Sequence, residues 1–431
     1  MSSPLSTLRT GILGLGAALA VGALQAAPPT AELTADQLVT QVLQANPGVQ
    51  ALEHAVNAAR ARALPAGALD DPMLSYAVAP RSIGAPGLDT GHIVRLEQPL
   101  PWFGKRATRR AAAQAHTNGV AAALQQRQQE AARDARLLYA DWFEVHGALR
   151  INTARQRTLA DLRETAEGLY RAGLGNQTGV VAATLRGEQR AQEALELKAR
   201  RKALAARINA LRNRPVATPL AAPGGLPLPE ALPDVATLAG PWERGHPALA
   251  RLRALEARAQ QQVALAQLDY RPDVRLMAQY LGTLPREENR AQVGISLNLP
   301  FGHGRRDAAL DAARADAEGL AAEWRERRNA LRAELAAVYA DAQSAIDTLA
   351  LYRSRMLPLA EQAQRAAQAD FAAGRGAARA AIDAEEDLLA TQLGSLRAHA
   401  RLYRLSVRLH WLLGADPMRP LADPLDQAHS P

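Results

Sequence analysis

The sequence of 431 residues contains no cysteine. Disulfides, cysteine-ligated zinc, thiol catalysis and a lipid-modified N-terminal cysteine are therefore excluded. Aromatic residues are also scarce, at 4% of the chain, whereas 48% of the residues are hydrophobic, mostly alanine and leucine. This composition is typical of long packed helices, in which alanine permits close approach, rather than of a thick globular core.

Lysine is nearly absent as well, since only Lys105, Lys198 and Lys202 occur. The formal net charge is +8, but the arginines of the chain are dispersed among acidic residues. A nucleic-acid-binding protein would cluster them with stacking aromatic residues. We therefore expect no nucleic-acid partner.

Long apolar runs are missing beyond the N-terminus. Residues 11–24 form an apolar run after Arg9, followed by Ala26, Ala27 and Pro28. At about 14 residues, this run is shorter than the roughly 20 that span a bilayer, which disfavours the alternative of a membrane anchor. The pattern predicts a signal peptide over 1–26, cleaved after Ala26, and hence a protein that leaves the cytoplasm.

An internal repeat, offset by about 200 residues, is the most informative pattern. Proline, glycine and tyrosine keep their register in both copies, which chance similarity between alanine-rich helices does not explain. The matched pairs are 46–47 with 246–247, 71–74 with 271–274, 98–104 with 297–302, 139–141 with 339–341, and 170–175 with 371–376. We predict a first repeat over 34–213, a proline-rich linker over 214–245, a second repeat over 246–417 and a tail over 418–431.

Each repeat shows the same order of elements: a helix, two short strands, a very long helix, a glycine-containing break and a return helix. The predicted helices are 47–63, 105–171, 177–212, 247–270, 305–373 and 377–413, with a further helix opened by a capping box at 34–37. Pro358 should kink or break the helix that contains it. The helix over 105–171 would be about 100 Å long. Its length nearly equals the combined length of the N-terminal helix and the return helix. This equality predicts that the two shorter helices stack end to end beside the long one.

Four strand candidates alternate between apolar and polar residues, so that one face is apolar and the other polar or charged. They span 73–79, 92–100, 274–280 and 292–299. The alternation fits a membrane barrel with a wet lumen, although a soluble sheet lying on helices would show it too. Four strands cannot close a barrel and lipid does not tolerate open edges, so a membrane location requires several chains. Polar lumen faces favour three chains over two.

These features together resemble TolC-like outer membrane efflux proteins, over about residues 34–417. The resemblance rests on the repeat, the Asn46-Pro47 helix start, the strand-to-helix junction at 98–105 and the glycine-rich tips. It implies a mainly helical chain that trimerises into a twelve-stranded β-barrel in outer-membrane lipid, with long antiparallel hairpins crossing the periplasm. The implied partners are a periplasmic adaptor (membrane fusion) protein and an inner-membrane pump of the resistance-nodulation-division type. Segments 71–74 and 101–105 most resemble the heavy-metal or cation efflux branch.

The resemblance also implies that both hairpin tips contact the adaptor at the entrance. The matching residues are Tyr170, Gly173, Leu174, Gly175, Phe371, Gly374, Arg375 and Gly376. A tight turn alone would explain the glycines, so Leu174 and Arg375 are the better contact candidates. The tyrosine, arginine and aspartate that latch the tip in some members are replaced by Phe371, Gly376 and Gly179, so a latch of that kind is not expected.

An acidic ring at the narrowest point is the other implied feature. Asp383 and Asp387, in the run 383–387, match the lumen aperture. Three copies of Asp383 around one axis would attract cations. The alternative, a solvated helix face whose acids suit the N-terminal dipole, explains the run equally well.

No nucleophile–base pair, phosphate loop or ligand cluster is present in the sequence. Single candidates such as His303, Met73 and Met277 are explained by a turn or by packing. We therefore expect a passive exit duct of a tripartite efflux system rather than an enzyme, with no cofactor and no metal site. The alternatives are a periplasmic adaptor and a structural coiled-coil envelope protein without channel activity.

Overall fold

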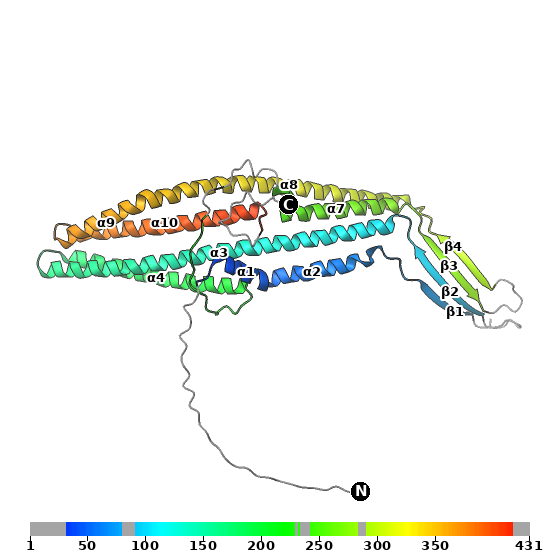
Figure 1. Ribbon diagram of the computed structural model, residues 1–431, viewed down its shortest axis with the longest axis horizontal. Helices are drawn as coiled ribbons and strands as arrows, with labels where there is room; N and C mark the ends of the chain where they lie inside the picture. Colours follow the sequence, from blue (N-terminus) through cyan, green and yellow to red (C-terminus); the bar gives the residue numbers. More distant parts are fainter. Residues whose placement is uncertain (1–31, 80–90, 229–231, 233–241, 283–289, 417–431) are drawn as a thin grey trace, which may run out of the picture.

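The computed structural model describes residues 32–79, 91–228, 232, 242–282 and 290–416. The predicted signal peptide and C-terminal tail lie outside these ranges. The molecule is elongated, with helices along most of its length and a small sheet at one end (Figure 1). None of the helices in the described part is both long and apolar enough to cross a membrane.

The order of elements occurs twice along the chain. The first set is α1 (Ala35–Ala45), α2 (Pro47–Ala63), β1 (Met73–Ala79), β2 (Gly91–Leu100), α3 (Lys105–Arg171) and α4 (Gln177–Leu211). The second is α6 (Trp242–Gly245), α7 (Pro247–Leu268), β3 (Val274–Leu281), β4 (Ala291–Leu297), α8 (His303–Leu351), α9 (Leu357–Ala372) and α10 (Ala378–Leu412). The predicted helices and strands are confirmed within a few residues, and the helix expected over 305–373 is divided near Pro358, as predicted.

Pro358 lies next to that division. A π-helical turn over Tyr352–Met356 separates α8 from α9, and the proline occupies the first turn of α9, where a missing N–H is tolerated. Across the hairpin, a Cβ added to Gly394 would lie 2.6 Å from the hydroxyl of Tyr352. Because Gly394 has no side chain, α10 leaves space for the Tyr352 ring at the break.

The predicted end-to-end stacking of helices is confirmed in the first repeat, where α2 and α4 follow one another along α3 (Figure 1). Asn46 joins them: its Oδ1 accepts hydrogen bonds from the N–H groups of Gly48 and Val49 at 3.0 and 3.3 Å, and its Nδ2 donates to the carbonyl of Leu211 at 3.1 Å. One side chain thus caps the start of α2 and satisfies the end of α4.

His246 occupies the same place in the second repeat. Its Nδ1 accepts from the N–H of Ala248 at 3.2 Å, and its ring lies against Trp242 and Trp411. At Gly414, just after α10, an added Cβ would lie 3.2 Å from the Cα of His246. The end of α10 and the start of α7 therefore meet as α4 and α2 do.

The main core lies around the middle of α3, where segment 214–228 crosses the helices. Tyr139 is fully buried and donates to the carbonyls of Leu33 and Gly225 at 2.9 and 3.2 Å, while the indole N–H of Trp142 donates to Ala221 at 3.0 Å. The described part of the predicted linker is therefore ordered and packed, although the boundaries of the two repeats remain a prediction.

The sheet has the order β1-β2-β3-β4, with every pair antiparallel. Strands from both repeats thus form one sheet, joined by the pairing of β2 with β3. Among the described residues, the outer edges of β1 and β4 have no strand partner.

The buried cap at His246 makes stability depend on pH. Burial, aided by the charge of Arg327, lowers the pKa of His246 from 6.5 to about 4. The folded protein therefore keeps the ring neutral where the unfolded chain binds a proton, and stability falls as the pH drops from 6.5 towards 4. We expect a loss of roughly 3 kcal/mol across this window, measured from thermal unfolding of the detergent-solubilised protein.

His246→Asn is the matched control, since Asn46 caps the equivalent junction. The variant should keep the cap and flatten the dependence on pH. Equal slopes for wild type and variant would show that another group controls acid stability.

Candidate functional site at the hairpin tips and the sheet

The two hairpin tips, between α3 and α4 and between α9 and α10, have the same backbone conformation. Gly173 and Gly374 have φ values of 72° and 69°, in the left-handed region that favours glycine. At Gly175 and Gly376, an added Cβ would lie 3.1 and 3.2 Å from the backbone nitrogens of Tyr170 and Phe371. Turn geometry thus accounts for all four glycines.

The tips differ in how the return helix begins. At the first tip, the side chain of Asn176 accepts a hydrogen bond from the N–H of Gly179 at 2.9 Å. At the second tip, Ala377 precedes α10 and provides no side-chain cap. The exposed Arg375 instead contacts Asp370, at 3.2 Å, on the α9 side of the turn.

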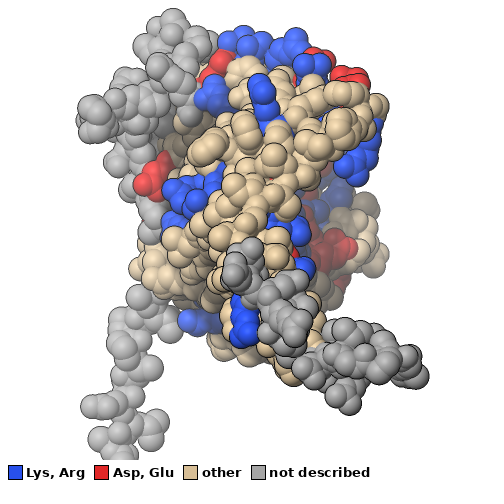
Figure 2. All heavy atoms as spheres, turned by 90° about the vertical axis from the view of Figure 1, so that its right-hand side faces the viewer, with Lys and Arg blue, Asp and Glu red and all other residues tan. Residues whose placement is uncertain are grey.

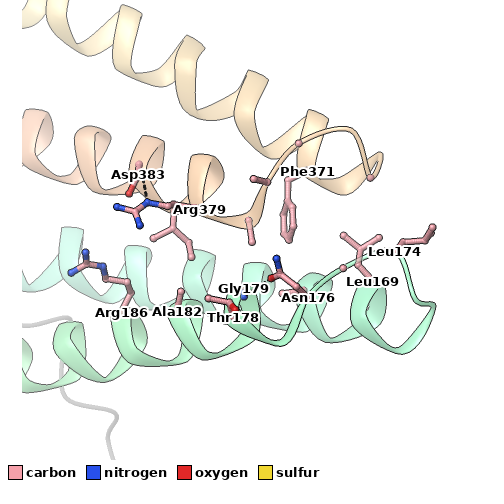
Figure 3. Close-up of a pocket in the computed structure, with 17 residues that line it drawn as sticks. Leu169, Leu174, Asn176, Thr178, Gly179, Ala182, Arg186, Phe371, Arg379 and Asp383 are labelled. Atoms are coloured by element: carbon pink, nitrogen blue, oxygen red, sulfur yellow. Dashed lines mark hydrogen bonds and ion pairs between the residues drawn. The ribbon is translucent and has the colours of Figure 1, made fainter.

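A cavity of about 430 Å³ lies between the two tips (Figure 3). Six of the predicted site residues line it: Leu174, Gly175, Phe371, Gly374, Gly376 and Asp383. Its other walls include Leu169, Asn176, Thr178, Gly179, Ala182, Arg186, Arg379 and Ile382. The predicted residues Tyr170, Gly173, Arg375 and Asp387 do not line it.

Two aromatic residues at equivalent tip positions have different surroundings. Tyr170 is 49% exposed, whereas Phe371 is 5% exposed and packs in an apolar cluster with residues of α3, α4 and α10. In Figure 3, Phe371 points from the second tip towards the first hairpin. Leu174 is 73% exposed. Within the isolated chain, Phe371 therefore joins the hairpins, while Leu174 and Tyr170 present apolar surface outward.

The acidic run on α10 divides between two faces. Asp383 and Asp387 are exposed, one helical turn apart, and Asp383 lies 3.6 Å from Arg379. Glu385 is buried, and Glu386 is half-buried, 3.8 Å from Arg190 on α4. Of these four acids, only the two aspartates are exposed.

Glu385 was not singled out by the sequence analysis. It is 1% exposed and accepts hydrogen bonds from Arg155 of α3 at 2.9 Å and from Gln364 of α9 at 3.1 Å. This contact joins the two repeats near their tips. The only sequence signal was helical spacing, since Ile382 and Leu388, three residues to either side, place Glu385 on the apolar face of the helix. Its partner Arg155 lies 230 positions away.

The sheet at the other end exposes an apolar face. The large hydrophobic residues on it are Leu74, Tyr76, Val78, Val94, Leu96, Leu276, Tyr280, Val293, Ile295 and Leu297. Phe103 and Phe301, which follow β2 and β4, are 87% and 80% exposed at the helix end of the sheet. Figure 2 looks onto this end: uncharged residues form a broad surface, with charged groups beside it. A large exposed apolar surface with aromatic residues near its margin is typical of membrane contact.

The comparisons with known proteins agree with this geometry. Residues 243–415 match the family model "Outer membrane efflux protein". The fold matches the outer-membrane channel OprN, with a TM-score of 0.76, 21% identity and coverage of 89% of this chain and 91% of that chain. The chain has the TolC-like channel fold, and the match to the outer membrane efflux protein model covers most of its second repeat. Among curated protein sequences, none matches this chain.

Two further structures of similar channels match over most of the chain. VceC from Vibrio cholerae gives a TM-score of 0.75 at 20% identity, covering 88% of this chain and 96% of that chain. CusC gives a TM-score of 0.74 at 17% identity, covering 90% and 93%. The predicted resemblance and fold class are confirmed.

This assignment confirms the predicted outer-membrane location, with the helices as the periplasmic extension. It identifies a channel class rather than an enzyme class, as predicted, and does not favour the alternatives of an adaptor or a structural coiled coil. Among the residues that the structure describes, no group of three or more histidine or acidic side chains could hold a metal ion.

The buried contact at Glu385 predicts a large effect of one substitution. Glu385→Ala would leave Arg155 largely buried without its carboxylate, and should destabilise the protein by about 3 kcal/mol or more. The measurement is the denaturation midpoint of the solubilised protein. Asp383→Ala, on the same helix but exposed, is the matched control and should cost less than about 1 kcal/mol. Similar losses for both variants would contradict a specific role for the buried pair.

Proposed function

We propose that three copies of the efflux protein form the exit duct of a tripartite efflux system. The observation that supports this most is the sheet, which has one exposed apolar face, one polar face and two unpaired outer edges. Unpaired strand edges are not tolerated in lipid, so β4 of one copy must pair with β1 of the next. Three copies of four strands give a barrel of twelve, wide enough for a channel.

In this duct the apolar face contacts lipid and the polar face lines the lumen. Tyr76 and Tyr280 lie on the apolar face nearer the loop end, while Phe103 and Phe301 lie at the helix end. Aromatic residues at both margins of an apolar band mark the two membrane interfaces. The long helices then extend into the periplasm, with both tips at the far end (Figure 1).

The tips are the proposed docking surface for a periplasmic adaptor, which connects the duct to an inner-membrane pump of the resistance-nodulation-division type. Leu174 and Arg375 are exposed on adjacent tips, so an adaptor could contact an apolar and a charged group together. The glycines between them set the turn and need no direct contact. The cavity between the tips offers a recess for an adaptor side chain.

The test is the location and native mass of the mature chain. Envelope fractionation should place it in the outer membrane, and native mass measurement of the detergent-solubilised species should give a trimer. Ile295→Asp should reduce the amount of outer-membrane protein, because it places a charge on the proposed lipid face, whereas Ser296→Asp, on the opposite face, should be tolerated. A soluble periplasmic monomer would overturn the duct.

For the cargo, we propose heavy-metal cations, attracted to the entrance by three copies of Asp383 and Asp387. Both carboxylates are exposed in the single chain. Cells without the channel should be sensitised to particular divalent or monovalent metals, and Asp383→Asn should restore tolerance less well than wild type. Asp161→Asn, at an exposed acid on α3, is the control. Unchanged tolerance across a metal panel, with the pump expressed, would count against this cargo.

A further inference from the structure

The polar face of the sheet carries a connected row of side chains. The guanidinium of Arg95 donates to Gln279 Oε1 at 3.1 and 3.2 Å, and Gln279 Nε2 donates to Gln292 Oε1 at 2.6 Å. The carboxylate of Glu97 lies 3.6 Å from Arg95 and 3.6 Å from Arg275, one oxygen towards each. These contacts cross β2, β3 and β4 and hold both arginines in place on one surface.

This row has more positive than negative charge. Two guanidinium groups share one carboxylate, so among the described strand residues of this face one positive charge per chain is left uncompensated. The two arginine side chains are also more exposed, at 41% and 57%, than Glu97, at 21%. A solute approaching this face therefore meets the guanidinium groups before the carboxylate.

Neighbouring charges at the helix end do not cancel the excess. A cavity of about 410 Å³ there is lined by Arg109, Asp70 and Asp273 together with Arg275. Lys105 Nζ lies 3.0 and 3.1 Å from the carboxylate oxygens of Asp273 and 3.2 Å from Asp269, and Arg306 donates to the backbone carbonyl of Asp269 at 2.8 Å. The three aspartates at this end are therefore matched by three cations: Lys105, Arg109 and Arg306. Arg275, which also lines this cavity, is therefore not neutralised there, and its charge is counted with the strand residues.

We propose that Arg95 and Arg275 form an anion-attracting collar inside the barrel and set its charge preference. This inference rests on the proposed function, in which the polar face lines the lumen and three copies surround it. Three excess positive charges enclosed by low-dielectric walls produce a potential that concentrates anions and repels cations. The collar suits small inorganic anions and the carboxylate or phosphate groups of exported solutes. A metal cargo would cross it best as a neutral or anionic complex.

The absence of native cysteine makes the collar directly testable. Ser75→Cys places a single thiol opposite Arg95, and Ser296→Cys places one opposite Arg275. In intact cells, each thiol is treated with a negatively charged and with a positively charged methanethiosulfonate reagent. The ratio of the two rates, divided by the same ratio for free cysteine, reports the local potential and is independent of thiol reactivity.

We expect the anionic reagent to be favoured about sevenfold at both thiols, since a potential of one kT per elementary charge acts on reagents whose charges differ by two. Arg275→Gln in the Ser296→Cys background should bring the ratio towards that of free cysteine, and Glu97→Gln should raise it. Native mass confirms that each variant still forms the wild-type assembly. A ratio at or below that of free cysteine, or one that Arg275→Gln does not change, overturns the collar.

A third thiol separates this failure from failure of the duct. Val293→Cys lies on the opposite face of β4, where the side chain is 88% exposed in the single chain and contacts lipid in the proposed barrel. It should react with neither reagent. Rapid labelling at this position, or no labelling at either serine position, overturns the barrel orientation itself and the collar with it.

Discussion

The architecture depends on one constraint: a single helix of 67 residues must be covered along its length by shorter helices. Helices α2 and α4 achieve this only if the end of one meets the start of the other, which brings unpaired carbonyl and N–H groups together at a buried site. Asn46 binds two of these N–H groups and one of these carbonyls with a single side chain. His246 provides the corresponding cap in the second repeat and adds a buried ring between two tryptophans.

The sheet and the tips place different demands on the same chain. At the sheet, alternation along each strand separates an apolar face from a charged one, and the strands from both repeats combine into one surface. At the tips, the hairpins are joined by packing at Phe371 and by the buried contact between Arg155 and Glu385. The first arrangement leaves edges open to other copies, whereas the second fixes the two hairpins within one chain.

Local patterns in the sequence predicted most of the fold. Alternation located the four strands, and proline and glycine located the helix ends, because these signals act over a few residues. The burial of Tyr170 and Phe371 could not be predicted in the same way. The two residues occupy equivalent turn positions, and each becomes exposed or buried according to which hairpin packs beside it. The same holds for Glu385, whose partners come from α3 and α9, and for segment 214–228, whose prolines indicate a linker while tertiary packing orders it. The family resemblance, and not the spacing, selected Asp383 and Asp387.

The missing cap at Ala377 has a consequence for motion at the second hairpin tip. A side-chain cap stabilises a helix start by about 1 kcal/mol, which changes the population of an opened first turn roughly fivefold. The start of α4 has this stabilisation from Asn176, whereas that of α10 does not. Fraying should therefore be concentrated at α10, and amide hydrogen exchange should be faster in its first turn than in that of α4. The two tips have the same backbone conformation, but the helix start at the second tip should open more often than that at the first.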